Sequence, residues 1–259
     1  GAGSAGCVLA DRLTANGKYR VLVIEAGPPD TNRWIHIPLG YGKLFAMPAV
    51  NWMYQSEAEP QLKGRSVFTP RGKVIGGSSS INGLVYIRGQ REDFDEWARL
   101  GNAGWGYNDV LPYFKKAEDQ QRGANAYHGK GGPLAVTDLP DKHELADAYI
   151  AAAEEIGIPR NDDFNGAQQE GAGYFQSTAR GGRRASCAVA YLHPAKQRAN
   201  LEVLSEALVT RVLFEGTRAI GAEFERAGTR QVVRAHREVL LCGGSFNSPQ
   251  LLELSGVGP

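Results

Sequence analysis

The feature that most constrains the fold of this chain is the glycine pattern at residues 1–6 together with the segments that follow it. The letters GAGSAG form a complete GxGxxG sequence. Residues 7–13 have the apolar spacing of a helix packed on a sheet, Asn16-Gly17 ends that helix, and residues 19–24 have the pattern of a buried parallel strand. This order of turn, helix and strand predicts an α/β fold whose glycines allow a tight turn at a helix N-terminus.

An acidic residue stands where this motif needs one. Glu25 follows the predicted strand, 19 residues after Gly6. A carboxylate about 20 residues beyond the glycines accepts hydrogen bonds from an adenosine ribose hydroxyl. The same acid could otherwise be a solvated residue at a strand end, but its neighbours favour a dinucleotide site. The strand that should precede the glycines is absent, so we do not expect residue 1 to be a natural start, and the neighbours of that strand would lack a pairing partner.

The bulk properties exclude several classes of protein. A chain of 259 residues predicts one or two domains, and a net charge of +1 gives no reason to expect nucleic-acid binding. The sequence shows no signal peptide and no apolar run near the roughly 18 residues that span a bilayer. We therefore expect a soluble protein, cytoplasmic or membrane-peripheral, although a targeting segment could precede residue 1. Cys7, Cys187 and Cys242 are far apart without metal-type spacing, so we expect reduced, buried thiols and no metal site.

The rest of the chain alternates between irregular and periodic stretches. Residues 30–70 are rich in Trp, Tyr and Pro without a clean period, which favours an ordered segment covering a ligand or an interface. Three further helices are predicted at 91–100, 108–120 and 139–156. From residue 200 the pattern becomes β, and the predicted strands are LEVLS, ALVTRVLF, AIGAEFE, RQVVRA and EVLLC.

Two more glycine-rich turns resemble anion-binding loops. Residues 71–82, RGKVIGGSSSIN, offer exposed N–H groups and hydroxyls, although such a loop could also be merely flexible. Residues 243–249, GGSFNSP, follow a predicted strand, with Ser248 expected as the N-cap and Pro249 as the first residue of a helix. Three such turns predict one large cofactor with several polar groups.

These segments together resemble a known family. The carrying motifs are GAGSAGCVLADRL, VIEAG, NWMYQSEAEP, RGKVIGGSSSINGLVYIRG, DFNGAQQEGAGYFQ and GGSFNSPQLLELSGVG. They are similar to the glucose-methanol-choline (GMC) oxidoreductases, FAD-dependent enzymes that oxidise alcohols, and most like their choline-dehydrogenase-like members. The resemblance covers essentially the whole chain. It implies a Rossmann-like FAD-binding domain, a parallel sheet plus an antiparallel β-meander, at 1–106 and 191–259, with part of an α+β substrate domain inserted at 107–190.

The resemblance also assigns residues to FAD. The first glycines would hold the pyrophosphate, Glu25 the ribose, the segment 74–85 the pyrophosphate and isoalloxazine, and a backbone group of Val209 the adenine. For the two valines among these residues, ordinary strand packing is the alternative reading. The assigned residues are Gly1, Gly3, Ser4, Ala5, Gly6, Glu25, Val74, Gly77, Ser78, Asn82, Gly83, Leu84, Val85 and Val209.

The implied reaction is hydride transfer from an alcohol carbon to the flavin N5, with the hydroxyl proton taken by a base. Family members that bind flavin covalently carry a histidine where this chain has Ile81, so FAD is expected to be non-covalent and dissociable. The base is expected C-terminal to Pro259, and no catalytic residue is assigned within the chain. None of the five histidines is assigned as the base, and His143 is given no further reading. His193 and His236 are interpreted as surface or helix-end residues, and His36 and His128 as loop residues, which are commonly solvated.

Other readings remain open or are set aside. As supplied, the chain could be a non-catalytic FAD-binding fragment that binds the cofactor poorly, and the parent could be a hydroxynitrile-lyase-like member without net redox chemistry. The electron acceptor, oxygen or a quinone, is not readable. The RGGRR run at 180–184 is a single copy, typical of a loop rather than an RNA-binding repeat. Asp162-Asp163 lack the spacing of a calcium loop and predict a turn.

Overall fold

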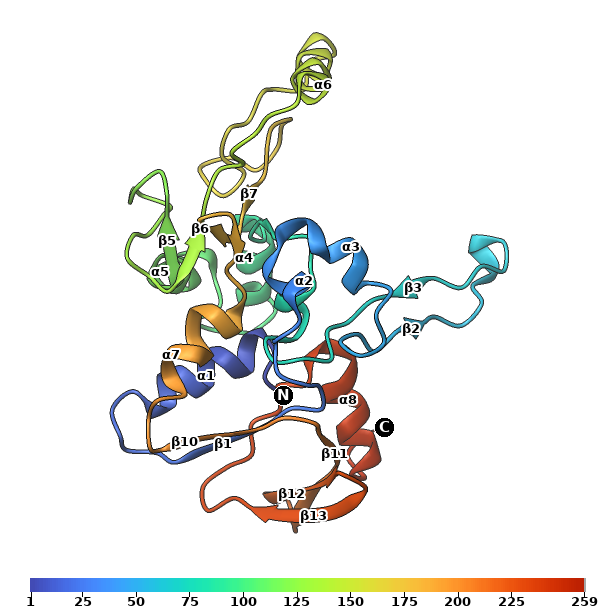
Figure 1. The fold of residues 1–259 in the computed structure, drawn as a ribbon. Helices are drawn as coiled ribbons and strands as arrows, with labels where there is room; N and C mark the ends of the chain where they lie inside the picture. Colours follow the sequence, from blue (N-terminus) through green and yellow to red (C-terminus); the bar gives the residue numbers. More distant parts are fainter. Residues whose placement is uncertain (259) are drawn as a thin grey trace. The chain divides into compact units, whose positions relative to one another are not determined.

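The structure is a computed structural model that describes residues 1–258, and it divides into two compact units. The first unit comprises Gly1–Gly83 and Ser186–Pro259, and the second comprises Leu84–Ala185. The mixed α/β fold is confirmed (Figure 1). The structural boundaries differ from the predicted 107–190 insertion, and the assignment of the parts to cofactor and substrate stays a prediction.

The first unit is built around one helix and a pair of parallel strands. Helix α1 (Ser4–Thr14) packs against β1 (Val21–Ile24), which pairs in parallel with β10 (Leu201–Leu204) (Figure 1). The helical turn η4 (Ala188–Leu192) and α7 (His193–Ala195) also contact α1. The core of this group consists of Ala2, Cys7, Ala10, Val23, Ile75, Ala188, Tyr191 and Leu192.

The predicted β-rich segment forms an antiparallel meander. Its strands are β11 (Ala207–Glu215), β12 (Arg218–Arg226) and β13 (Thr229–Arg234), in that order across the sheet. The last predicted strand is wrong, because residues 238–242 form none within the described chain. No neighbouring strand there offers the ladder of backbone hydrogen bonds that a strand requires.

Helix α8 (Gly244–Leu254) begins earlier than predicted. Its N-cap is Gly243, and Pro249 lies inside the helix instead of opening it. The Ser248 hydroxyl accepts a hydrogen bond from the Gly243 N–H at 3.1 Å. Ser248 is therefore not the N-cap, because its side chain folds back on the preceding turn from a position already inside the helix.

Residues 30–83 are ordered, as predicted, but contain only short elements. A second core gathers Ile35, Leu44, Val50, Val74 and Ile81, with half-buried Trp34 and Met47 packed against it. The elements are α2 (Arg33–His36), η1 (Pro38–Gly40), α3 (Tyr41–Leu44), β2 (Tyr54–Gln55), η2 (Pro60–Leu62), β3 (Phe68–Thr69) and η3 (Gly77–Ser80).

The second unit mixes helices with short strand pairs. The predicted helix at 108–120 stops at Ala117, because the next three residues pair in parallel with another strand. The predicted helix at 139–156 begins only at Glu144, where the His143 ring accepts from the Leu145 N–H at 3.1 Å. The elements are β4 (Val85–Tyr86), α4 (Arg91–Arg99), α5 (Tyr107–Ala117), β5 (Glu118–Gln120), β6 (Leu134–Val136), α6 (Glu144–Glu155), β7 (Gln176–Ser177), β8 (Ala179–Arg180) and β9 (Arg183–Arg184).

Two further predictions, one for this unit and one for the described chain, can be compared with the structure. The glycines of the RGGRR run have φ of 55° and 72° and form the turn between β8 and β9, so the run is a hairpin turn. Among residues 1–258, no helix combines the length and the apolar character that a bilayer crossing needs.

Candidate cofactor-binding site

The first two glycine-rich turns lie against each other in the first unit. The Gly76 N–H donates to the Ala2 carbonyl at 2.7 Å. Gly77 has a φ of 55°, and a Cβ on it would lie 2.7 Å from the Gly3 Cα. Only glycine fits such a close approach of two backbones at a positive φ. The turns predicted independently from the sequence therefore form one continuous surface.

The third turn is brought to the same place. A Cβ on Gly1 would lie 2.4 Å from the carbonyl oxygen of Cys242, the residue directly before the third turn. A Cβ on Gly6 would lie 1.9 Å from the Gly1 carbonyl oxygen. At Gly1 and Gly6 of the GxGxxG sequence, glycine is therefore required because another backbone packs where a Cβ would lie.

The N-terminus of α1 is open between these turns. Its N-cap, Gly3, has no side chain to accept from the first helical N–H groups, and Ser4 and Ala5 are exposed. The first N–H groups of a helix lack intrahelical partners and carry the positive end of the helix dipole. In the neighbouring loop Ser78 and Asn82 are also exposed. This surface suits a phosphate or another anionic group.

Glu25 holds the glycine turn to the sheet, a contact that sequence reasoning missed. The side chain is buried, and its two oxygens accept from the Ala2 N–H at 2.7 Å and the Gly27 N–H at 3.0 Å. Its own N–H donates to the Leu204 carbonyl at 2.8 Å. A carboxylate offers about four acceptor positions, so these two bonds leave capacity for ligand hydroxyls. Its predicted contact with a ribose stays a prediction.

The remaining assigned residues are distributed over both units. Val74 lies in a loop and is fully buried in the second core, so core packing, not strand packing, explains part of its role. Val209 is half-buried in β11, where strand packing is the corresponding explanation. Leu84 and Val85 open the second unit: Leu84 is buried with a φ of 64°, and Val85 pairs with Ser177 of β7. Their assigned contacts with the cofactor stay predictions.

Aromatic side chains connect β2 to the start of α8. The Tyr54 hydroxyl donates to the Asn247 Oδ1 at 2.7 Å, and Arg71 lies 4.6 Å from the centre of the Phe246 ring. Burial raises the pKa of the Tyr54 hydroxyl above its ordinary value, which keeps it a donor. These residues are almost 200 positions apart, and only the aromatic richness of 30–70 gave a signal for such a contact.

Two histidine interpretations are wrong. His36 was expected in a loop, yet it ends helix α2, and its Nε2 lies 2.7 Å from the Asp30 carbonyl oxygen. His128 was expected to be solvated in a loop, yet only 2% of its surface is exposed, and its ring lies between two carboxylates. The His193 Nε2 donates to the Asp30 Oδ1 at 3.0 Å, and His143 caps α6. The expected burial of the cysteines is confirmed for Cys7, where it raises the pKa of the thiol to about 12, whereas Cys187 and Cys242 are half-buried.

The comparison with protein families decides the relationship. Residues 1–259 match the family described as GMC oxidoreductase. The chain belongs to the GMC oxidoreductase family. Its relatives include the mitochondrial choline dehydrogenase of Mus musculus, 49% identical over the whole chain, and the oxygen-dependent choline dehydrogenase of Sinorhizobium fredii, 47% identical. The chain spans 44% and 47% of the lengths of these two proteins.

Solved structures of this GMC oxidoreductase's relatives show the same fold. A pyridoxine 4-oxidase from Mesorbium loti superposes with a TM-score of 0.95 at 37% identity, covering 100% of this chain and 51% of the oxidase. An FAD-dependent oxidoreductase from Chaetomium thermophilum gives 0.92 at 31% identity, covering 100% and 47%. The chain therefore corresponds to about half of each relative.

Proposed function

We propose that this chain is the FAD-binding portion of a GMC oxidoreductase that oxidises an alcohol. The observation that carries the proposal is the contact of the Gly3 and Gly77 backbones beside the open N-terminus of α1. A side chain at Gly77 would push the two turns apart beside the helix N-terminus that would hold a pyrophosphate. In this reading the first unit is a Rossmann-like FAD-binding domain, and the compact second unit, Leu84–Ala185, contributes to the substrate-binding part.

The residues of the first unit have separate tasks in this proposal. The N–H groups at Ser4 and Ala5 would donate to the pyrophosphate, and Ser78 would add a hydroxyl donor. Glu25 would accept from the ribose while keeping the glycine turn on the sheet. Bound FAD would supply the hydride acceptor for oxidation of the alcohol. Ile81 is buried in the second core and cannot form a histidyl–flavin bond, so the proposed cofactor is non-covalent.

The test is to purify the complete protein to which this chain belongs and examine its flavin. We expect visible flavin absorbance that acid precipitation releases into the supernatant, and bleaching when an alcohol such as choline is added without oxygen. A complete protein without any flavin contradicts the proposal. Flavin that is present but never bleached, together with cleavage of a cyanohydrin, would favour the lyase alternative.

Glu25→Gln tests the proposed ribose contact and the turn together. In this variant the side-chain NH₂ group faces either the Ala2 N–H or the Gly27 N–H, so that a donor meets a donor. The substitution also removes the negative charge that strengthens the other hydrogen bond. Losing a hydrogen bond to a charged group costs roughly 1.5–3 kcal/mol, so we expect FAD to bind about 10- to 100-fold more weakly. Flavin titration monitored by fluorescence measures this loss.

The matched control is Glu202→Gln. Glu202 is an exposed residue of β10, the strand paired with β1. We expect that variant to bind FAD with unchanged affinity. Equal affinities of the Glu25→Gln variant and the original protein would show that Glu25 has no part in the site.

A further inference from the structure

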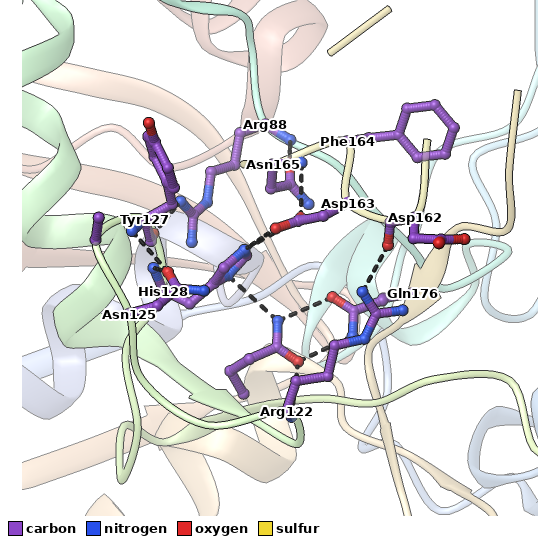
Figure 2. Close-up of polar contacts among 12 residues, drawn as sticks. Arg88, Arg122, Asn125, Tyr127, His128, Asp162, Asp163, Phe164, Asn165 and Gln176 are labelled. Carbon is purple, nitrogen blue, oxygen red and sulfur yellow. Dashed lines mark hydrogen bonds and ion pairs between the residues drawn. The ribbon is translucent and has the colours of Figure 1, made fainter. Parts of the chain in front are cut away.

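The second unit contains a cluster of charged side chains, three buried and one half-buried, that the proposed function does not use. Arg88, Glu118, His128 and Asp163 alternate in sign along a chain of contacts. Figure 2 shows the contact between His128 and Asp163, with Arg88 beside them. Arg88 follows β4, Glu118 opens β5, and the other two lie in separate loops. The cluster therefore joins four segments that are distant in the sequence.

The His128 ring has a carboxylate at each of its two nitrogens. Nδ1 lies 3.0 Å from the Glu118 Oε1, and Nε2 lies 2.9 Å from the Asp163 Oδ2. The Gln120 amide nitrogen also lies 3.2 Å from Nδ1, and it donates to the Gln176 Oε1 at 2.8 Å. A neutral imidazole has one N–H and one acceptor nitrogen, so it would turn a lone pair toward one of the carboxylates. Only the imidazolium donates to both.

Neighbouring groups balance the charges of the cluster. The Arg88 Nη2 lies 3.0 Å from the Glu118 Oε2, which also accepts from the Gly129 N–H at 2.9 Å. With His128 protonated, the two cations offset the two carboxylates. The other titratable or charged groups facing it are Tyr86 of β4, 3.4 Å from the Arg88 Nε, and the pair of Arg122 and Asp138, 2.9 Å apart. Burial acts to lower the pKa of His128, but hydrogen bonds with Asp163 and Glu118 raise it to about 9.

The same cluster fixes one loop. Asp163 accepts from the Asn165 N–H at 3.1 Å, and the Asn165 Oδ1 accepts from the Arg88 N–H at 2.7 Å. Residues 164–170 line a cavity of about 520 Å³, together with Arg91, Tyr107 and Tyr127. His128 therefore fixes one wall of this cavity through Asp163, the residue directly before that wall.

We propose that His128 is a protonation-dependent clamp, which holds residues 163–166 in place as an imidazolium and releases this wall of the cavity when it loses its proton. This inference is independent of the proposed function. The folded pKa of His128 lies above its ordinary value of 6.5, so the clamp stabilises fully below about pH 6.5 and is lost as the pH rises through about 9. The pKa values of Glu118 and Asp163 are lowered, so their contribution is lost instead at acidic pH.

Hydrogen–deuterium exchange of the complete protein tests the clamp. After correction for the intrinsic exchange rate, we expect protection of a peptide covering residues 161–169 to fall at least about ten-fold between pH 6.5 and pH 9.5. In the His128→Gln variant, protection should be low at both values. His143→Gln, which changes an exposed histidine of the same unit, should keep the original profile.

A second variant covers the case in which His128→Gln does not fold. Asp163→Asn keeps an acceptor for Nε2 but removes a charge, so the loss of protection should move to a pH at least about one unit lower. The proposal is overturned if the original protein protects this peptide equally at both pH values. It is also overturned if the midpoint in Asp163→Asn is unchanged.

Discussion

Replacing Gly77 with alanine in the complete protein is expected to weaken FAD binding on the order of 100-fold, equivalent to about 3 kcal/mol. The new Cβ would lie 2.7 Å from the Gly3 Cα, and Gly77 has a φ of 55° that alanine adopts only under strain. Because the atoms nearest to this Cβ all belong to the Gly3 backbone, no side chain can rotate away to make room. The two turns must separate, and the N-terminus of α1 would no longer face a formed loop.

Flavin content after purification and the dissociation constant from titration measure this effect. Gly42→Ala is the matched control, since a Cβ on Gly42 in α3 has no atom within 4 Å, and we expect normal flavin content. Unfolding temperatures of both apoproteins separate a local effect from misfolding. A Gly77→Ala protein with original affinity would remove the basis for placing the pyrophosphate between these turns.

Arg88→Met is expected to destabilise the second unit by about 3–5 kcal/mol, because it leaves a buried carboxylate without its arginine partner. The side chains of Arg88 and Glu118 are 3% and 0% exposed, and their charged atoms are 3.0 Å apart. Methionine also loses the hydrogen bond of 2.8 Å to the Tyr127 carbonyl and the stacking on Phe114. Removing one partner of this buried pair therefore lowers the stability strongly, although the intact pair stabilises the fold little more than apolar residues in its place would.

Thermal unfolding of the complete protein, read together with hydrogen exchange of peptides from 84–185, measures the loss. Arg99→Met is the control from the same unit, since Arg99 pairs with Glu96 on the exposed face of α4. Exposed pairs of this kind are screened by water and contribute little to stability. If both variants unfold alike, the cluster around Arg88 has no special role in stability.

Local patterns were sufficient to predict much of the framework. The helix at α1, the strand at β1 and the meander follow from periodicity and turn residues, which act between near neighbours in the chain. The order of residues 30–70 follows from their aromatic-rich composition. The tight turns at the glycines could also be predicted, because glycine is the residue that lets two backbones approach where a Cβ would clash. The same patterns, carried by long motifs, were enough to indicate the family.

Errors arose where a residue depends on a partner far away in the sequence. Residues 238–242 look like a strand, but strand pairing requires a second backbone. His128 looks like a solvated loop histidine, and nothing near it in the sequence predicts that Asp163 packs on its ring. Ser248 and Pro249 have the local preference of a helix start, but α8 begins at Gly244.

The sequence by itself thus determined most of the helices and strands, the occurrence of three glycine turns, and the family to which they belong. Only the tertiary structure decided that those turns share one surface, that Glu25 bonds to the first of them, and that His128 joins two carboxylates. The physical reason is that propensity and spacing are local, whereas the contacts that place a charge or exclude a side chain form only after distant segments pack together.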